Sequence, residues 1–269
     1  YLVSGYGYVD ISDYTFFRSV RQLKPSHYIK ISLEDKKFSQ VRYWDLDPSK
    51  KAEFKTEDEV YRRFYNLFED SISLRLRSDV ELGISLSGGL DSSSIACVAA
   101  GLLKGARLKA FSSCFDEREY DERKFLKPIL EKTGAESNLI FAKPESLFDD
   151  METILWHQEE PYSTLSVFPQ WYVMKLAREK GVKVLLSGQG GDETLAGYHK
   201  YYFYLFADLV CSLKWSRVVK EIDIYKKLNG DKYIFGKTVK IILSHMVPKF
   251  AKSRFNSLLN RDFPDYLNS

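Results

Sequence analysis

Two glycine-rich segments carry the residues whose types and spacing could do chemistry. The first, at residues 87–93, reads Ser-Gly-Gly-Leu-Asp-Ser-Ser and follows an apolar run that predicts a strand. Glycine has no Cβ, so the turn can be tight, and the amide N–H groups of the turn and of the next helix then point at one spot. Such amides bind an anion together with the helix dipole. Hydroxyls of Ser87, Ser92 and Ser93 add donors, so the segment predicts a cradle for nucleotide phosphates.

Asp91 lies inside this cradle and indicates what else must bind there. A carboxylate repels phosphates unless a cation lies between them, so Asp91 predicts Mg²⁺ that bridges it to pyrophosphate oxygens. The Walker pattern Gly-x4-Gly-Lys-Ser/Thr is absent from this segment, which leaves no lysine to hold a γ-phosphate in flight. The pattern favours an enzyme that splits ATP between the α- and β-phosphates. A plain glycine-rich turn is the simpler alternative, but the strand, the full motif and the helix together favour the cradle.

The second segment, at residues 184–198, reads Val-Leu-Leu-Ser-Gly-Gln-Gly-Gly-Asp-Glu-Thr-Leu-Ala-Gly-Tyr. An apolar strand again ends in a glycine-rich turn that carries acids. Asp192 is a candidate second Mg²⁺ ligand, whereas Glu193 could pair with a basic group or cap the next helix. The amide of Gln189 can donate and accept hydrogen bonds but cannot take a proton at neutral pH. Two such loops at strand ends of one sheet would face one crevice.

The elements that must position these loops alternate between strands and helices. The capping box Thr56-x-x-Glu59 predicts an amphipathic helix to about Ser78, with one apolar face. Strands are expected at 80–86, 107–115, 138–142 and 182–187, and helices at 91–104, 121–133, 146–158 and 167–180. Gly134 and Gly181 lie where helix C-caps belong. The alternation predicts an α/β fold whose parallel sheet has helices on both faces, with ligands at the carboxyl ends of the strands.

The two ends of the chain differ from this central part. Residues 1–46 predict β structure, because Ile29, Ile31 and Leu33 alternate with polar residues as in a half-buried strand. Residues 47–55 read as a linker. Residues 198–269 are rich in Tyr, Phe, Lys and Leu and predict helices broken near Gly230 and Pro248.

Composition limits the class of protein and its partners. The chain has 269 residues, is 44% hydrophobic and carries a formal net charge of +3, which is far from the excess of a nucleic-acid-binding protein. No apolar run reaches the roughly 18 residues of a membrane span. The three cysteines are scattered and predict reduced thiols in a reducing compartment. We therefore expect a cytoplasmic protein with small-molecule substrates, no nucleic acid and no membrane partner; a homodimer is kept as an open expectation.

The two loop motifs resemble those of the asparagine synthetase family, specifically its C-terminal synthetase domain. That domain belongs to the ATP-pyrophosphatase superfamily, whose PP-loop fold is of the adenine nucleotide alpha-hydrolase type. The resemblance is carried by residues 86–93, 186–193 and Gly197-Tyr198, and more weakly by 28–46, 110–113, 120–122 and 160–162. It implies a remnant of a glutaminase domain (Ntn-hydrolase-like) at 1–46, a linker at 47–55, a synthetase domain at 56–197 and its helical C-terminal part, cut short, at 198–269.

The resemblance also implies roles for single residues. Catalytic roles fall to Asp91, Gln189 and Asp192, and the Mg²⁺ ligands would be Asp91 and Asp192. ATP and the acyl-adenylate would be held by Ser85, Leu86, Ser87, Gly88, Gly89, Leu90, Asp91, Ser92, Ser93, Ser113, Ser187, Gly188 and Gln189. In the implied reaction the β-carboxylate of aspartate attacks the α-phosphate of ATP, giving β-aspartyl-AMP and pyrophosphate. Ammonia, normally from glutamine hydrolysis in an N-terminal domain, then releases AMP and leaves asparagine.

Three departures from the family pattern bear on this assignment. Synthetases of the family usually carry Glu where this chain has Gln189, which favours a variant with a different amine or acid partner. The chain begins with Tyr1 in place of the family's catalytic cysteine, so any activity should use free ammonia. The family's Arg-rich segment with its Val-Pro-Phe-Leu-Asp element is not found before Ser269. We therefore expect residues 1–269 alone to bind nucleotide weakly and turn over poorly.

Three other functions stay open. A relative that acts on another carboxylate, such as a sugar acid, a β-amino acid being cyclised to a β-lactam or a peptide side chain, is the nearest, and Gln189 favours it. An RNA-modifying ATP pyrophosphatase is more distant, because such enzymes often add cysteine pairs and a basic surface. A non-catalytic domain that has kept the loops is disfavoured by Asp91 and Asp192, since a retired site has no reason to hold two carboxylates near phosphates.

Overall fold

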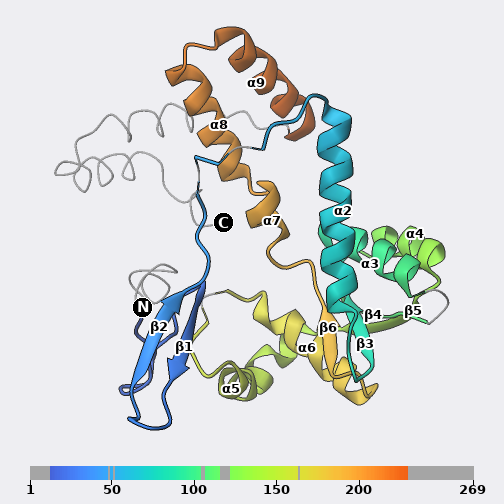
Figure 1. Cartoon of the computed structure of the whole chain (residues 1–269). Coiled ribbons are helices and arrows are strands. Elements are labelled where there is room, and N and C mark those ends of the chain that lie inside the picture. Colours follow the sequence, from blue (N-terminus) through green and yellow to red (C-terminus); the bar gives the residue numbers. More distant parts are fainter. Residues whose placement is uncertain are drawn as a thin grey trace. The chain divides into compact units, whose positions relative to one another are not determined.

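The computed structural model describes residues 13–47, 49–50, 52–103, 107–115, 122–162 and 164–229. The chain divides into two compact units, residues 1–188 and 189–269, and Figure 1 labels their elements. The predicted helix breaks near Gly230 and Pro248, and Tyr120 and Asp121 of one weaker motif, lie outside the described residues.

The first unit contains a parallel sheet of four strands. These are β3 (Leu82–Ser85), β4 (Lys109–Cys114), β5 (Glu136–Phe141) and β6 (Val184–Leu186), in the spatial order β5-β4-β3-β6. Ile84 of β3 pairs with Ala110 on one side and Leu186 on the other. Each predicted strand is present within a few residues of its expected place. Because the strands are parallel, their carboxyl ends meet at one edge of the sheet.

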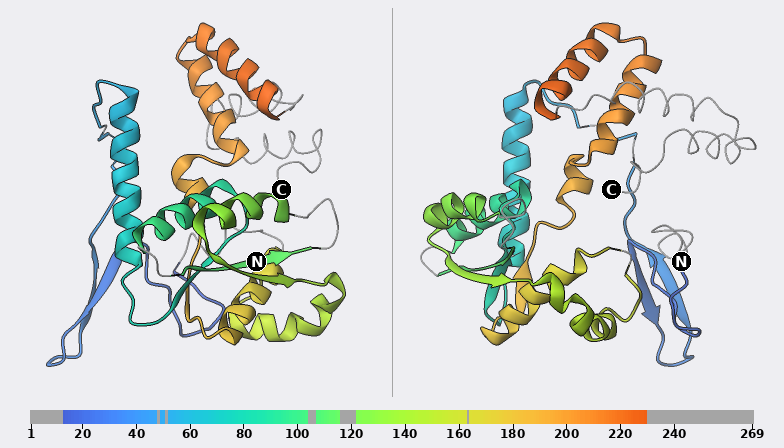
Figure 2. Two further views of the ribbon diagram at one scale, coloured as in Figure 1. Left: turned by 90° about the vertical axis from the view of Figure 1, so that its right-hand side faces the viewer. Right: turned by 180° about the vertical axis from the view of Figure 1, so that it is seen from behind.

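Helices cover both faces of this sheet, as Figure 2 shows. The helices are α3 (Leu90–Leu102), α4 (Arg123–Thr133), α5 (Leu147–Gln158) and α6 (Val167–Glu179), with a single turn η1 (Pro144–Ser146) before α5. On one face, Ile84 and Ala110 pack with Ala96 of α3 and Leu126 of α4. On the other, the fully buried ring of Phe111 packs against Val173 and other residues of α6. The predicted α/β fold class is confirmed.

Helix ends follow the local signals in the sequence. Gly134 ends α4 in the left-handed conformation (φ 64°), and Gly181 (φ 75°) follows α6 in the same way. Helix α2 (Glu57–Arg75) starts at the predicted capping box: the main-chain N–H of Glu59 donates to Thr56 Oγ1 at 3.3 Å, and its carboxylate accepts the N–H of Lys55 at 2.8 Å.

Helix α2 ends at Arg75, slightly before the predicted end at about Ser78. Its apolar face is also only partly buried. Ile72 is buried and Phe68 packs beside it in the core, whereas the side chains of Phe64 and Leu67 are 45% and 53% exposed. Only the C-terminal half of α2 therefore contributes to the sheet's core.

A short antiparallel hairpin stands at the N-terminal side, formed by β1 (His27–Ile31) and β2 (Phe38–Arg42). The predicted strand is present, but the prediction that it is half-buried is wrong: the side chains of Ile29 and Ile31 are 44% and 64% exposed, and Leu33 lies beyond the strand. A two-stranded sheet buries an apolar face only when another layer covers it, and no described residue buries this one.

The described part of the second unit is helical, as predicted. It comprises α7 (Gly191–Leu195), α8 (His199–Cys211) and α9 (Trp215–Asn229). Helices α8 and α9 pack through Phe203, Phe206 and Tyr225, and the Tyr225 hydroxyl lies 2.8 Å from His199 Nδ1. Among the described helices, none has the combination of length and apolar composition that crossing a bilayer requires.

Candidate active site

The carboxyl edge of the sheet brings the first predicted loop beside the start of the second. Strands β3 and β6 are neighbours, so residues 85–93 and residues 187–188 leave the sheet side by side. Gly188 touches the first turn of α3: a Cβ added to it would lie 2.8 Å from Ser92 N and 3.0 Å from Asp91 Cβ. The end of β6 therefore sits against the N-terminal turn that carries Asp91, and only glycine fits there without a shift.

The backbone of the first loop turns tightly at Gly88 and leads directly into α3, as the predicted anion cradle requires. Gly88 has φ +84°, and a Cβ there would lie 2.9 Å from Cβ of Phe125, so glycine is needed both for conformation and for space. Gly89 caps α3, and the first main-chain bond of the helix runs from Ser93 N to Gly89 O at 3.1 Å. The amides at positions 90–92 thus have no intrahelical acceptor and can bind a ligand.

Two of the three predicted serine hydroxyls hold the loop itself. Ser87 Oγ and Ser92 Oγ lie 3.1 Å apart. The Ser92 hydroxyl donates to Gly89 O at 3.3 Å, and Ser87 Oγ accepts the N–H of Gly89 at 3.3 Å. These contacts are local and fix the turn. Ser93 differs, because its Oγ is buried and has no hydrogen-bond partner among the described residues.

Ser113, at the carboxyl end of β4, shares this property with Ser93. Among the described residues, the buried side-chain polar atoms without a partner are Ser93 Oγ, Ser113 Oγ and Trp171 Nε1. A buried polar group without a partner calls for a ligand or water, because leaving it bare costs free energy. Two of these three atoms belong to the residues that the sequence assigned to nucleotide binding.

The carboxylate of Asp91 stands in the first turn of α3, half-buried. The described residues provide it with no hydrogen bond and no ion pair. A negative charge in the first turn of a helix also interacts favourably with the helix dipole. This interaction is the simplest structural role for Asp91. No group of three or more His, Cys, Asp or Glu residues in the described part of the chain could hold a metal alone. Proteins bind Mg²⁺ through one or two carboxylates together with substrate phosphates and water, and the role of Asp91 as such a ligand stays a prediction.

The other residues predicted to bind ATP differ in what they can offer. Leu86 is buried; its N–H donates to Phe111 O at 2.9 Å and its carbonyl accepts the Ser112 hydroxyl at 2.6 Å. The side chain of Leu90 is 87% exposed. Ser85 is half-buried at the end of β3, and Ser187 is exposed after β6. Their roles stay predictions.

The remaining predicted residues lie in the second unit, in and before α7. Gly190 turns the chain with φ +88°, and Thr194 Oγ1 donates to its carbonyl at 2.6 Å. Glu193 accepts the hydroxyl of Tyr198 at 2.9 Å, and this hydrogen bond raises the pKa of Tyr198. Gln189 and Asp192 are exposed. That they share one crevice with Asp91 stays a prediction.

Sequence reasoning missed Phe125, which backs the first loop from α4. Its Cβ lies where a side chain at Gly88 would point, and Lys124 Nζ stands 4.8 Å from the centre of its ring. No local pattern in the sequence indicates this contact, because it joins the loop to a helix that begins 35 residues after Gly88. Phe125 is therefore part of the wall that shapes the cradle.

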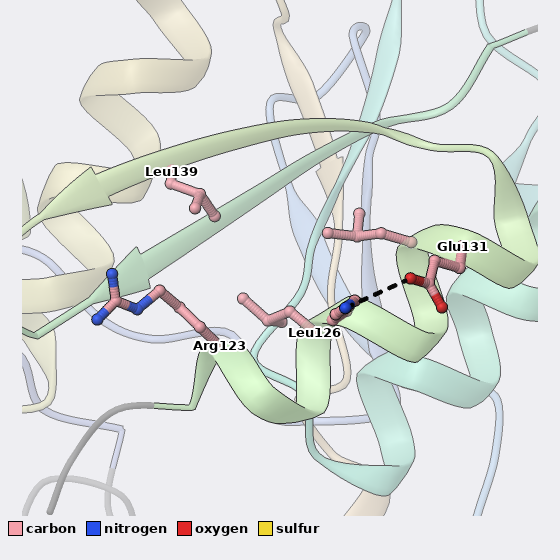
Figure 3. A pocket seen from close by; sticks show the side chains of 6 residues that line it. Arg123, Leu126, Glu131 and Leu139 are labelled. Carbon is pink, nitrogen blue, oxygen red and sulfur yellow. Dashed lines mark ion pairs between the residues drawn. The ribbon is translucent and has the colours of Figure 1, made fainter. Parts of the chain in front are cut away.

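A separate pocket of about 260 Å³ lies between α4 and β5 and contains none of the predicted site residues. Figure 3 shows Leu126 and Leu139 on its walls. Glu131 on its rim faces Lys127, with 3.9 Å between Oε1 and Nζ. The side chains that line it are three leucines together with Arg123, Lys127 and Glu131, and none of them belongs to the two loops, so the strand ends remain the candidate active site.

Comparison with known proteins identifies the family of this chain. Residues 63–259 match the sequence model of the family described as asparagine synthase, which is more than half of the chain. The chain belongs to the asparagine synthase family. The resemblance read from the two loops is thereby confirmed.

The named relatives of this chain include both amidases and asparagine synthetases. The chain is 31% identical to the amidase chyE of Penicillium rubens over 206 residues, which is 71% of this chain and 30% of that protein. It is 29% identical to a putative glutamine-hydrolyzing asparagine synthetase 2 of Methanocaldococcus jannaschii over 246 residues, 90% of this chain and 47% of that one. It is 35% identical to the glutamine-hydrolyzing asparagine synthetase 1 of Bacillus subtilis over 155 residues, which is 56% of this chain and 24% of that protein. The chain thus spans less than half the length of these relatives.

Proposed function

We propose that this chain is the ATP-using part of an enzyme that activates a carboxylate as an acyl-adenylate and converts it to an amide. One observation carries the proposal. Near the carboxyl edge of the sheet, the buried hydroxyls of Ser93 and Ser113 and the carboxylate of Asp91 have no hydrogen-bond partner among the residues that the structure describes. Membership of the asparagine synthase family supports ATP as the molecule that these groups bind.

The residues would divide the work as follows. The amides at positions 90–92 and the Ser93 hydroxyl would hold the phosphates. Ser113, with the backbone at 85–87, would hold adenine and ribose, and residues 187–189 would lie beside the acyl group. Asp91 and Asp192 would bind Mg²⁺, which when bound neutralises charge on the departing pyrophosphate. The chain's part in catalysis is then alignment and charge neutralisation.

The chemical steps balance without a further reagent. An oxygen of the substrate carboxylate forms a bond to the α-phosphorus, and the bond from that phosphorus to the β-bridging oxygen breaks, so pyrophosphate leaves. Ammonia then attacks the acyl carbon, AMP leaves with the electron pair of the acyl–oxygen bond, and the nitrogen loses a proton. The amide of Gln189 cannot take that proton at neutral pH, so its part would be to orient a reactant by hydrogen bonding.

Aspartate is our first choice of substrate, with ammonia derived from glutamine. The relatives named glutamine-hydrolyzing asparagine synthetases support it, since they match up to 90% of this chain. A different carboxylate is the second candidate. It is favoured by Gln189 and by relatives from two fungi that are named amidases, chyE and chry2 of Gibberella zeae.

Product analysis tests the proposal. The whole enzyme of which this chain is proposed to be the ATP-using part would be incubated with ATP, Mg²⁺, ammonium and single carboxylates, and the nucleotide products would be separated. We expect AMP and pyrophosphate, formed only with the right acid, and mass spectrometry of the amide separates aspartate from its competitors. Formation of ADP and phosphate would contradict the proposal.

A variant links that chemistry to the site. We expect Asp91→Asn to lower pyrophosphate formation by about two orders of magnitude or more, as is typical when an electrostatic group at a reaction centre is lost. Asp70→Asn, on the exposed side of α2, is the matched control and should retain activity. Equal activity of the two variants would show that the carboxylate at position 91 takes no part.

A further inference from the structure

Gly197 lies against the carboxylate of Asp192. The N–H of Gly197 donates to the carbonyl oxygen of Asp192 at 2.9 Å, which closes the turn after α7. A Cβ added to Gly197 would fall on Oδ1 of Asp192 and lie 2.8 Å from its Cγ and 3.1 Å from its Cα. The side chain of Asp192 therefore occupies the space that any other residue at position 197 would need.

Backbone conformation does not explain this glycine. The residues with positive φ in the segment are Gly190 (88°) and Ala196 (57°), and Gly197 is not among them. An alanine at 197 would meet no backbone strain of that kind, and the three nearest atoms to its Cβ all belong to Asp192. Two of these atoms belong to the side chain of Asp192 and the third is its Cα, at 3.1 Å. The two closest contacts, and so the main requirement for glycine, are therefore with one side chain.

The neighbouring carboxylate is held by a different contact. Glu193 accepts the Tyr198 hydroxyl at 2.9 Å, whereas no described residue donates a hydrogen bond or forms an ion pair with the Asp192 carboxylate. Of the two acids in α7, the one whose direction depends on Gly197 is the one left available for a cation. The two carboxylates therefore differ in their neighbours: Tyr198 holds Glu193 by a hydrogen bond, whereas Gly197 leaves room for Asp192.

We propose that Gly197 is a positioning residue for Asp192: by lacking a side chain it lets the carboxylate fold back over the turn, in the orientation that binds Mg²⁺. The inference rests on the proposed function, because it assumes that Asp192 is a ligand. An added methyl group would turn the carboxylate away, because its closest contacts are with Oδ1 and Cγ of Asp192.

Binding of Mn²⁺ as a spectroscopic substitute for Mg²⁺ tests the inference without an activity assay. Free Mn²⁺ would be measured by electron paramagnetic resonance during titration in the presence of ATP. We expect Gly197→Ala to weaken Mn²⁺ binding about tenfold or more, as is usual when a residue that orients a metal ligand is lost. Ala196→Gly, which adds no atom, is the matched control and should bind as the unaltered protein does.

The double variant decides whether Gly197 acts through Asp192. Asp192→Ala removes the carboxylate, so adding Gly197→Ala to it should cause no further loss of Mn²⁺ affinity and little further loss of thermal stability. An additive loss in either measurement would overturn the inference, even if Gly197→Ala alone folds poorly, and so would unaltered Mn²⁺ binding by Gly197→Ala. If Asp192→Ala itself binds Mn²⁺ normally, the assignment of Asp192 as a ligand fails, which is a different result.

Discussion

The hydroxyl of Ser112 donates to the carbonyl oxygen of Leu86 at 2.6 Å, and this bond ties β4 to the residue that begins the first loop. Ser112 is buried. The next residue, Ser113, points to the other face of the sheet, and its buried Oγ has no partner among the described residues. Two adjacent serines on one strand thus differ in their hydrogen bonding. The hydroxyl of Ser112 is bonded within the protein, whereas that of Ser113 is available to a ligand.

This difference predicts opposite effects of two alanine substitutions. Ser112→Ala should lower the free energy of unfolding by about 1–2 kcal/mol, because it leaves the Leu86 carbonyl without its donor. Ser113→Ala should leave stability unchanged or raise it, since it removes a bare buried hydroxyl, and it should weaken ATP binding. Urea unfolding and calorimetric titration with ATP and Mg²⁺ measure both effects. Full ATP affinity in Ser113→Ala would contradict the assignment.

The close contact of Gly188 with the first turn of α3 predicts that alanine at position 188 disturbs the first loop. The added Cβ would lie 2.8 Å from the main-chain nitrogen of Ser92, and a backbone atom cannot rotate away. We expect Gly188→Ala to lose about 1–3 kcal/mol of stability together with ATP affinity.

Gly101 provides the control for this substitution. It lies in α3, and apart from the helix's own backbone no described atom comes within 4 Å of its Cβ position, so Gly101→Ala should gain about 0.5–1 kcal/mol from helix propensity and bind ATP normally. A gain of stability in Gly188→Ala as well would mean that the loop moves to accommodate the methyl group, and that the contact between Gly188 and Ser92 is not close enough to exclude a side chain.

Sequence could predict the elements of the sheet because each strand is an apolar run ending at a turn signal. The run at 80–86 gives β3 at Leu82–Ser85, and Gly134 ends α4 as expected. The contacts that shape the site were beyond such patterns. Gly188 meets Ser92 only because β6 pairs with β3, and the sequence gives no sign that the hydroxyl of Ser92 is used locally while that of Ser93 is not.

The two hydrogen bonds of the capping box predict how substitutions at the start of α2 change its stability. Thr56→Ala removes the acceptor of the Glu59 N–H and should cost about 1 kcal/mol. Glu59→Gln keeps an acceptor for the Lys55 N–H and should cost less. Thermal unfolding of the two variants measures the difference. An unchanged stability of Thr56→Ala would contradict the role of the capping hydrogen bond, and an equal loss in Glu59→Gln would show that the charge of Glu59 matters as much as that bond.

The amide of Gln189 predicts a change in turnover when it becomes a carboxylate. Glutamate can accept the proton that the attacking nitrogen loses, whereas glutamine cannot. We expect Gln189→Glu to raise kcat for amide formation from ammonia. Steady-state kinetics with each carboxylate provide the measurement, and unchanged kcat with every acid would show that charge at this position plays no part.

Gly83 predicts a coupling across the sheet that supports the first loop. A Cβ on Gly83 of β3 would lie 2.7 Å from Cε2 of Phe111 and 2.8 Å from Cδ2 of Leu185, and Phe111 is fully buried. Gly83→Ala should therefore cost about 1–3 kcal/mol by overpacking. Phe111→Leu opens space at the same point, so the double variant should lose less than the two single losses together, with a coupling of about 0.5–3 kcal/mol. Strict additivity in urea unfolding would mean that β3 moves as a whole to make room, and the loop at its end would then move with it.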